Sequence, residues 1–318
     1  MVRLDEVQEV AIIGAGVMGS GIAQTFAQAG YAVRLQARHA ETLRAARDRI
    51  ARNQAAMVRA ALLSEGAAGE ALARIRTTTS LEEAARGCHF VNENVPEDLP
   101  LKREVFAALD RAAPRDAVLS TDTSGLSIST IAAATNRPQM VVGLHWMNPP
   151  HLMPPVEVIR GERTANPTMD FTCALARRIG RVPLRVERDA PGFIWNRLQL
   201  ALVREAVHVV ERGIASPETV DLAITAGLGL RWAAVGPLRI MDLAGLATFQ
   251  AVASYLYGDL CAAAAPNPML AAKVAGGETG ARSGRGFYEY PPGAAEAAVA
   301  ARDAKLFELL RLFRPPDR

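Results

Sequence analysis

Short apolar runs alternate with longer amphipathic stretches through the first half of the chain. Runs of four or five mostly β-branched residues predict strands, and apolar residues at helical spacing predict the helices between them. The strand candidates are residues 10–13, 32–35, 90–94, 117–120, 141–144 and 156–159, and the helix candidates include 20–29 and 40–63. Strands that alternate with helices favour a parallel sheet covered by crossover helices, so we expect a doubly wound α/β fold.

The pattern changes near residue 189. From Phe193 onward the chain reads as helical, without the period-two alternation of strands. The segment 192–212 has apolar residues on nearly every side, which is typical of a buried helix. We expect it in a core shared with neighbouring helices or with a second subunit. The sequence therefore predicts an α/β domain over residues 1–188 and an all-helical domain over residues 189–318.

Composition and charge exclude several classes of protein. Half of the 318 residues are apolar and the formal net charge is +3, with basic residues scattered rather than clustered. We therefore expect no nucleic-acid partner, and no apolar run reaches the roughly 18 residues that a membrane span needs. The absence of a signal-peptide pattern and three isolated cysteines favour the cytoplasm. The histidines show no HxH or HExxH spacing, so no metal site is expected.

A glycine motif follows the first predicted strand and opens the first predicted helix. It reads GAGVMG, with Gly14, Gly16 and Gly19 around Val17 and Met18. The first glycine permits a tight turn, the second lets the backbone approach a pyrophosphate, and the third allows close helix–strand packing. This context predicts a dinucleotide site in a Rossmann-type domain, with the phosphates at the helix N-terminus.

The end of the second predicted strand bears on the choice of dinucleotide. An acidic residue is expected there, about 20 residues after the first glycine, to bind the ribose 2′-hydroxyl of NAD. This chain has Ala37 and Arg38 instead. Loss of the carboxylate removes repulsion against a 2′-phosphate, and Arg38 could bind it, so among the NAD(P) cofactors the sequence favours NADP(H). Alternatively, Arg38 is a surface residue and NAD still binds through the other contacts.

His145 and Glu157 are the candidate catalytic pair. His145 follows the apolar run 141–144, and Glu157 lies twelve residues later in a second apolar run. A strand, a proline-containing turn and a returning strand would bring the two side chains together. A carboxylate beside an imidazole fixes the tautomer and stabilises the imidazolium, as a general base requires.

Several segments, in order along the chain, resemble the 3-hydroxyacyl-CoA dehydrogenase family. They are GAGVMG (14–19), NVPEDLPLK (94–102), STDTSGL (120–126), GLHWMNPP (143–150), PVEV (155–158), DAPGFIWNR (189–197), MDLAGL (241–246) and SGRGFYEY (283–290). The resemblance implies a Rossmann domain followed by a helical domain that forms a homodimer. It also implies NAD(P)-dependent oxidation of the 3-hydroxyl group of a small-molecule substrate, as in fatty acid metabolism.

The resemblance assigns further roles. His145 would take the proton of the hydroxyl group, Glu157 would orient His145, and Ser124 and Asn196 would bind the reacting oxygen. The positions that match cofactor-lining residues of the family are Glu97, Lys102, Asn148 and Arg282. The four intact catalytic positions argue against the alternative of a non-catalytic, dinucleotide-binding structural protein such as the lens crystallins of this fold.

The substrate stays open between two readings. Thioester-specific members of the family bind coenzyme A through a serine and lysines on the helix after the second strand. The matching positions here are Asn53 and about Ala60, and no lysine precedes Lys102. Alternatively, Arg49, Arg52 and Arg59 substitute for the lysines. HWMNPPH (145–151) is similar to a pyridine-carboxylate dehydrogenase branch, and GLGLRW (227–232) to the gulonate 3-dehydrogenase branch. Arg231 could there pair with a free carboxylate. An L-3-hydroxyacyl-CoA and a CoA-free acid are both expected substrates.

Overall fold

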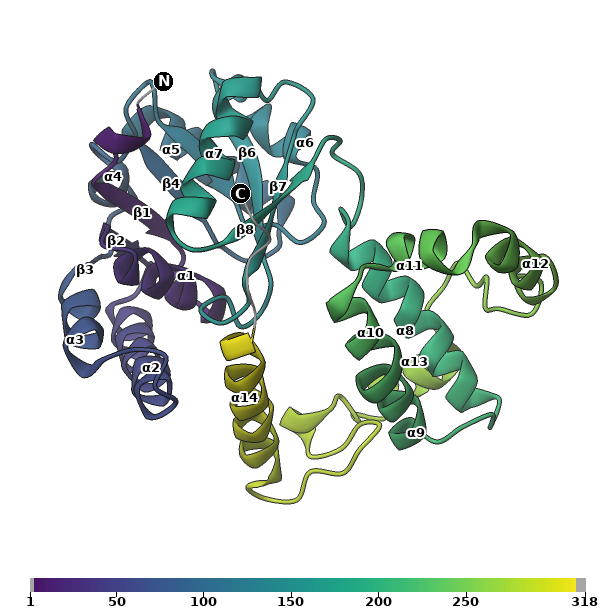
Figure 1. Ribbon diagram of the computed structural model, residues 1–318. Coiled ribbons are helices and arrows are strands. Elements are labelled where there is room, and N and C mark those ends of the chain that lie inside the picture. The colour runs from purple at the N-terminus through teal and green to yellow at the C-terminus, as the bar shows by residue number, and fades with distance from the viewer. Residues whose placement is uncertain (1–2, 313–318) are drawn as a thin grey trace. The chain divides into compact units, whose positions relative to one another are not determined.

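The computed structural model describes residues 3–312, which fall into two compact units (Figure 1). The sheet unit comprises the described residues up to Asn196 together with residues 302–312, and the helical unit comprises residues 197–301.

The sheet unit contains an eight-stranded sheet. Its strands are β1 (Glu9–Ile13), β2 (Ala32–Gln36), β3 (Ile75–Thr78), β4 (Phe90–Glu93), β5 (Val118–Thr121), β6 (Val141–Trp146), β7 (Pro155–Ile159) and β8 (Val182–Val186). They lie in the order β3-β2-β1-β4-β5-β6-β7-β8, and every neighbouring pair is parallel except β6 and β7. The predicted doubly wound fold is confirmed. The strand order reverses between β1 and β4, where such folds bind ligands.

Helices cover both faces of this sheet, and each face has its own apolar core. The first core includes residues of α1 (Val17–Gln28), α2 (Ala40–Arg59), α3 (Glu65–Ala73) and α7 (Asn166–Arg178). The second includes residues of α4 (Leu81–Ala85), α5 (Leu99–Ala112) and α6 (Ile128–Ala132). Val10 and Ile12 of β1 belong to the first core, whereas Ala11 and Ile13 belong to the second, because successive side chains of a strand point to opposite faces.

The sequence pattern did not reveal β3 and β8, which are the two edge strands. β3 has exposed positions and a polar sequence, and β8 contains Pro183, which an edge strand tolerates. The predicted helix 40–63 ends earlier, at Arg59, where Ala61 adopts a positive φ of 54°. β6 extends two residues beyond its predicted end and therefore includes His145.

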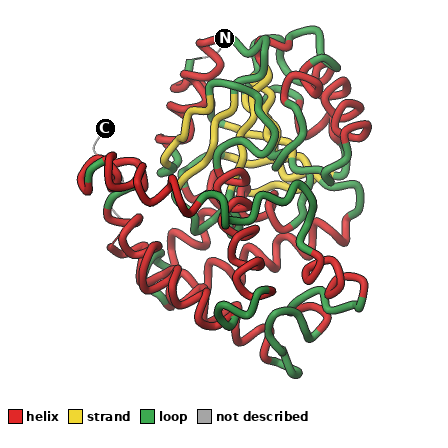
Figure 2. Tube along the Cα trace, turned by 90° about the vertical axis from the view of Figure 1, so that its right-hand side faces the viewer, coloured by secondary structure: helices red, strands yellow, loops and turns green. Residues whose placement is uncertain are grey.

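The second half of the chain is helical, as predicted. Its helices are α8 (Trp195–Glu211), α9 (Pro217–Leu222), α10 (Gly229–Ala234), α11 (Pro237–Ala244), α12 (Leu246–Leu256), α13 (Pro268–Ala275) and α14 (Ala294–Leu312), with a π-helical turn at Ala223–Leu228. In Figure 2 the strands lie together in the sheet unit. Val207 of α8 is buried, but Leu198 and Leu200 are exposed, so neighbouring helices do not bury this helix on all sides. Burial by a second subunit stays a prediction.

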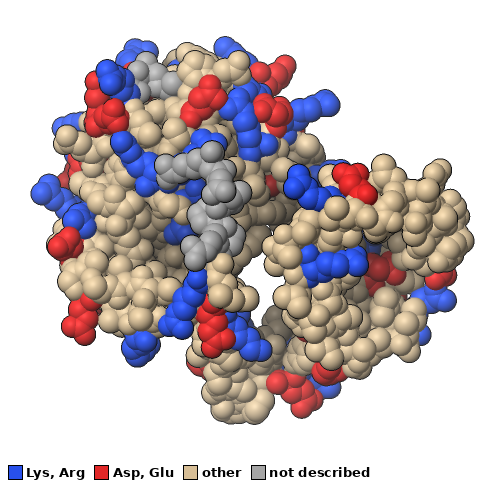
Figure 3. All heavy atoms as spheres, viewed as in Figure 1, with Lys and Arg blue, Asp and Glu red and all other residues tan. Residues whose placement is uncertain are grey.

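The surface shows no face of a single charge in the view of Figure 3, where acidic and basic side chains are interspersed. None of the helices in residues 3–312 combines the length and the apolar character that crossing a membrane requires.

Candidate active site

His145 and Glu157 occupy directly opposed positions on the antiparallel strands β6 and β7. Opposed residues in such a pair project from the same face of the sheet, so their side chains meet. His145 Nδ1 lies 2.7 Å from Glu157 Oε2, and both side chains are buried. The carboxylate accepts a hydrogen bond from Nδ1–H, which leaves Nε2 of the imidazole as an acceptor. The pair therefore has the geometry of a base held by a carboxylate.

The second oxygen of Glu157 is bound by the start of α8. Oε1 accepts hydrogen bonds from the backbone N–H groups of Ile194 (2.8 Å) and Trp195 (3.0 Å). Just before them, Gly192 and Phe193 have positive φ angles of 77° and 49°. This conformation is rare for a bulky residue such as Phe193, and it turns the two N–H groups toward the carboxylate. The backbone strain is therefore located where it positions the pair.

Two aromatic rings flank the imidazole. The ring centroids of Phe193 and Trp195 lie 5.6 and 5.7 Å from that of His145. Such contacts restrict rotation of the imidazole and keep water away from it. Sequence reasoning did not assign either ring to the site, although both belong to the quoted segment DAPGFIWNR.

Ser124, Asn196 and Glu97 come together at the loop that follows β5. Asn196 Nδ2 donates to the backbone oxygen of Ser124 at 2.6 Å. Glu97 Oε1 accepts from Thr123 Oγ1 (2.6 Å), Ser124 N (2.9 Å) and Gly125 N (3.2 Å). Glu97 thus fixes the backbone of this loop, while Ser124 itself is exposed. The roles predicted for Ser124, Asn196 and Glu97 stay predictions.

Lys102 lies in a buried ion pair below this loop. Its ammonium is 2.8 Å from Glu93 Oε1 and 3.5 Å from Glu97 Oε2, and its side chain is buried. Thr121 Oγ1 also donates to Glu93, at 2.7 Å, and burial raises the pKa of that carboxyl. The lysine therefore organises carboxylates from within the fold. Sequence reasoning missed Glu93, which stands at the carboxyl end of β4 between Asn92 and Asn94.

Asp122 is another carboxyl group that the sequence did not single out. Desolvation raises its pKa well above the usual range, against the backbone N–H of Trp146, which donates to Oδ1 at 2.8 Å. This bond joins the end of β5 to the residue that follows His145. A signal was present, since STDTSGL places a carboxyl at a strand end, where ligands of such sheets bind.

A cavity of about 950 Å³ lies at the point where the strand order reverses. It is lined by the glycine loop, the end of β2 and the start of the loop after β4. The predicted cofactor residues that line it are Gly14, Gly16, Val17, Met18, Ala37 and Arg38. Gly16 is the N-terminal cap of α1 and has no side chain to bind the free N–H groups there, as a pyrophosphate site requires.

Each of the three positions in the loop requires glycine for a different physical reason. A Cβ on Gly14, whose φ is 100°, would stand 2.6 Å from the oxygen of Asn94, and one on Gly19 would stand 1.8 Å from the oxygen of Gly14. A Cβ on Gly16 would meet no protein atom within 4 Å. Gly14 and Gly19 are therefore needed by the fold, and Gly16 leaves room for a ligand. The cavity fits a dinucleotide.

The remaining predicted residues are more dispersed. Asn148 is exposed in the loop after β6, and Asn53 of α2 donates to Gln24 Oε1 at 3.2 Å. Arg231 of α10 and Arg282, in the turn Ala281–Ser283, belong to the helical unit, so their contribution to the site stays a prediction. Among the described residues no group of His, Cys, Asp and Glu could hold a metal ion.

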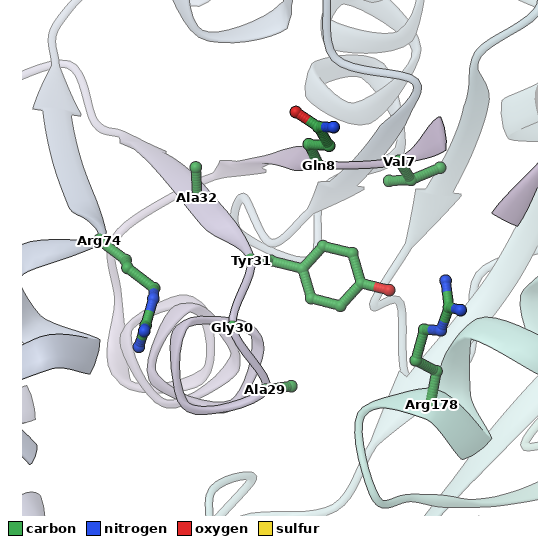
Figure 4. Close-up of a pocket in the computed structure, with 8 residues that line it drawn as sticks. All are labelled: Val7, Gln8, Ala29, Gly30, Tyr31, Ala32, Arg74 and Arg178. Atoms are coloured by element: carbon green, nitrogen blue, oxygen red, sulfur yellow. The ribbon is translucent and has the colours of Figure 1, made fainter. Parts of the chain in front are cut away.

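A second cavity, of about 660 Å³, lies at the opposite edge of the sheet, where β1 and β2 begin. Figure 4 shows the Tyr31 hydroxyl pointing toward Arg178. Both arginines of this cavity are engaged by carboxylates: Arg178 by Asp5 at 2.8 Å, and Arg74 by Glu70 at 3.0 Å. It therefore offers a ligand less free charge than the cavity at the glycine loop.

Comparison with known families identifies the class of protein. The 3-hydroxyacyl-CoA dehydrogenase NAD binding domain matches residues 9–190, and the C-terminal domain of the same family matches residues 192–290. The chain belongs to the 3-hydroxyacyl-CoA dehydrogenase family. It is an oxidoreductase that acts on CH–OH groups, and its N-terminal domain binds NAD(H).

The relatives carry different substrate names. The chain is 37% identical over 308 residues to 5-formyl-3-hydroxy-2-methylpyridine 4-carboxylate 5-dehydrogenase from Mesorhizobium japonicum, covering 96% of this chain and 98% of the relative. It is 38% identical over 286 residues to a probable 3-hydroxybutyryl-CoA dehydrogenase from Bacillus subtilis, covering 90% and 98%.

Solved structures show the same two groups. A crystal structure of the pyridine-carboxylate dehydrogenase, titled an NAD+ dependent dismutase, superposes with a TM-score of 0.89 at 35% identity and covers 96% of this chain and 98% of that chain. A 3-hydroxyacyl-CoA dehydrogenase from Archaeoglobus fulgidus superposes with a TM-score of 0.68 at 33% identity, with the same coverages.

Proposed function

We propose that this protein is an NAD(P)-dependent dehydrogenase that oxidises a hydroxyl group of a small carboxylic acid that is not bound to coenzyme A. The observation that carries the catalytic part is the buried pair of His145 and Glu157, in which Nε2 remains an acceptor. The family supplies the reaction class, and the substrate is the new element of the proposal.

His145 Nε2 takes the proton from the substrate hydroxyl, and Glu157 stabilises the imidazolium that forms. Ser124 and Asn196 bind the reacting oxygen, and Phe193 and Trp195 exclude water from the imidazole. A nicotinamide cofactor, when bound at the glycine loop, would supply the acceptor for the hydride of the substrate carbon. Glu97, Lys102, Asn148 and Arg282 are assigned to the cofactor side of the site, the first two through the loop that Glu97 binds.

Three observations support a CoA-free acid over a 3-hydroxyacyl-CoA. Neither Asn53 nor Ala60 supplies a cation to a nucleotide, and Asn53 is engaged by Gln24. The relative from M. japonicum is named as acting on a free pyridine carboxylate and covers more of this chain than the relative from B. subtilis. Arg231 is exposed on α10, and among residues 3–312 no carboxylate pairs with it within 4 Å, so its guanidinium can bind the substrate carboxylate.

The test is an assay of NADH and NADPH oxidation at 340 nm with acetoacetyl-CoA and a panel of free oxo acids. We expect turnover with at least one free acid, at a kcat/KM at least tenfold above that for acetoacetyl-CoA. The Arg231→Met variant should lose about tenfold or more with the free acid, since a charge-assisted bond contributes about 1.5–3 kcal/mol. Preference for acetoacetyl-CoA would contradict the substrate, and equal effects of Arg231→Met on both substrates would remove Arg231 from recognition.

The cofactor proposal extends from NAD(H) to NADP(H). Ala37 is buried at the end of β2 and Arg38 is exposed beside the cavity, so a 2′-phosphate would meet a cation and no carboxylate. Ala37→Asp should restore a partner for the ribose hydroxyl and shift the preference toward NAD(H) by about tenfold or more. Arg38→Ala is the companion variant and should weaken NADPH more than NADH. An unchanged ratio of the two cofactors in both variants would contradict the proposal.

We also propose that the protein is a cytoplasmic homodimer formed through the helical unit. The exposed apolar side chains of that unit, including Leu198 and Leu200, support this assembly because large apolar patches mark interaction surfaces.

A further inference from the structure

We propose that the last turns of α14 are a specificity element that covers the end of α2 and keeps coenzyme A from binding there. The inference rests on the proposed function, because it explains how the protein would act on free acids and reject their thioesters. It concerns residues 302–312, which the candidate active site does not use.

The chain returns to the sheet unit at its end. Residues 302–312 group with that unit, although residues up to 301, which precede them in the same helix, group with the helical unit. The guanidinium of Arg311 donates to the backbone oxygen of Ala60. Ala60 is the C-terminal cap of α2, and the last carbonyl groups of a helix lack partners within it. Arg311 therefore binds a group that α2 leaves available.

One face of α14 is docked and the other is not. Phe307 is 9% exposed, whereas Leu309 is 61% exposed. Asp303, Leu306 and Leu310, which are half-buried, lie at helical spacing around Phe307 and share its face. The burial of Phe307 shows that the contact extends beyond the single bond of Arg311.

The other end of this docked segment lies near the loop after β6. The charge of the Asp303 carboxylate raises the pKa of the His151 imidazole, and the charge of the Arg302 guanidinium lowers it. His151 lies six residues after His145. Eight residues separate Asp303 from Arg311, which in a helix corresponds to about 12 Å. The segment thus runs from the neighbourhood of the His151 loop to the end of α2.

This path covers the place that a thioester would need. By the family resemblance, coenzyme A is held at positions Asn53 and about Ala60, and Ala60 is where Arg311 binds. A nucleotide and a helix cannot occupy the same surface. A small free acid has no nucleotide and does not need this surface, so α14 would exclude the thioester while leaving the free acid unaffected.

The comparisons place α14 outside the two domains that the family models match. The family's C-terminal domain ends at residue 290, before α14 begins at Ala294. The match to the M. japonicum dehydrogenase leaves fewer residues of this chain unmatched than α14 contains, whereas the B. subtilis match leaves a tenth of the chain. The A. fulgidus chain, titled a 3-hydroxyacyl-CoA dehydrogenase, also matches 96% of this chain. Length alone does not assign the substrate, and the inference rests on the contacts of Phe307 and Arg311.

The experiment compares two ways of removing the docked segment. One variant ends at residue 292, and the other is the full chain with Phe307→Ser and Arg311→Ala. Leu309→Ser, on the exposed face of the same helix, is the matched control. Coenzyme A itself is the probe in titration calorimetry, and kcat/KM is measured with acetoacetyl-CoA and with the best free acid. NADH binding reports whether the sheet unit is folded.

We expect the wild type and Leu309→Ser to bind coenzyme A at least tenfold more weakly than both other variants. The kcat/KM for acetoacetyl-CoA should rise at least tenfold in those variants, with less than a threefold change for the free acid. If the shortened chain fails to bind NADH, the full-length double variant decides. Folded variants that bind coenzyme A no better than the wild type would overturn the inference and leave the free-acid proposal standing. A wild type that prefers acetoacetyl-CoA would overturn both.

Discussion

Glu157 uses its two oxygens for two separate purposes. Oε2 accepts a hydrogen bond from Nδ1–H of His145, and Oε1 accepts hydrogen bonds from the backbone N–H groups of Ile194 and Trp195 at the start of α8. Bonds from charged partners of this kind are shorter and stronger than neutral ones. The carboxylate thus connects the tautomer of the base to the position of the next element of the chain.

Replacing this carboxylate by an amide tests the pairing. In Glu157→Gln the amide oxygen can keep the bonds from Ile194 and Trp195, which turns the amide NH2 toward Nδ1 of His145. Nδ1 must then accept, so the proton moves to Nε2 and the imidazole can no longer act as a base. We expect kcat to fall by about 10²–10⁴-fold with NADH affinity nearly unchanged.

His145→Gln should show a loss of similar size, and His89→Gln, at a half-buried position outside the candidate site, is the control. Single-turnover and steady-state kinetics give kcat, and fluorescence titration gives cofactor affinity. A Glu157→Gln enzyme with normal kcat would show that the carboxylate does not control the base.

Protonation of His151 should make the free energy of unfolding depend on pH. Burial, the largest cause, lowers the pKa of its imidazole to about 4; Asp303 raises the pKa, whereas Arg181 and Arg302 lower it further. In the unfolded chain the pKa is about 6.5, so between about pH 6.5 and 4 the unfolded state binds the extra proton. The free energy of unfolding should therefore be complete above pH 6.5 and decrease by about 2 kcal/mol between pH 7 and pH 5 through this group.

Denaturant unfolding of the wild type and of His151→Gln at both pH values isolates this contribution. The variant keeps Asp303, Arg181 and Arg302, so its stability should vary less with pH by that amount. Parallel pH dependences of the two proteins would contradict the neutral, buried state of His151.

The sequence predicts only part of the site at this scale. His145 and Glu157 could be paired because the proline-containing turn between two apolar runs sets the strand register. Glu93 and Asp122 could not, because their contacts come from elsewhere in the fold, from Lys102 on α5 and from Trp146 on β6. Phe193 and Trp195 depend on a positive φ that a sequence pattern does not show for a non-glycine residue.

The glycine loop between β1 and α1 separates fold requirements from ligand requirements. Gly14 has a positive φ, and a Cβ there would stand too close to the oxygen of Asn94, whereas Gly16 has an ordinary φ of −69° and faces open space. The two positions therefore differ in what an added methyl group would disturb.

Gly14→Ala should lower the stability of the sheet unit by about 2–4 kcal/mol and abolish cofactor binding, because strain and a backbone clash are combined. Gly16→Ala should leave the melting temperature within about 2 °C, since surface changes free of such strain are usually within 0.5 kcal/mol, and weaken NADH at least about tenfold. Differential scanning calorimetry and NADH titration of the pair measure both quantities. Equal loss of stability in the two variants would contradict this division of roles.

The elements themselves were predictable where the sheet is covered on both faces. β1, β4, β5 and β6 are buried along nearly their whole length. β1 and β6 are mostly apolar in sequence, and β4 and β5 each begin with two apolar residues. β3 and β8 are edge strands. Their polar residues and a proline interrupt the apolar pattern that predicts a strand. Tertiary pairing with β2 and β7, rather than their own sequences, makes them strands.

At the scale of the whole molecule, the change from strands to helices was visible near residue 189, whereas the return of residues 302–312 to the sheet unit was not. A helix carries no sequence mark of the unit that it joins, because α14 has just one docked face and a bond from Arg311 to a backbone oxygen. Because every residue has a backbone oxygen, the partner of Arg311 cannot be recognised from its residue type.

Several large apolar side chains of the helical unit are exposed. Leu238 and Leu243 of α11 are 76% and 75% exposed, and Leu198, Leu200 and Tyr255 are also exposed. Water contact with such a surface is unfavourable, and two-fold dimers are the most common way to cover it.

We expect light scattering coupled to size exclusion to give twice the mass of one chain at micromolar concentration. Leu238→Asp combined with Leu243→Asp should shift the mass toward the monomer, because two desolvated carboxylates on each subunit oppose association. Leu309→Asp, at an exposed position of α14, should leave the dimer intact. A wild type that elutes as a monomer would contradict the assembly, and a dimer unaffected by the two aspartates would place its interface away from α11.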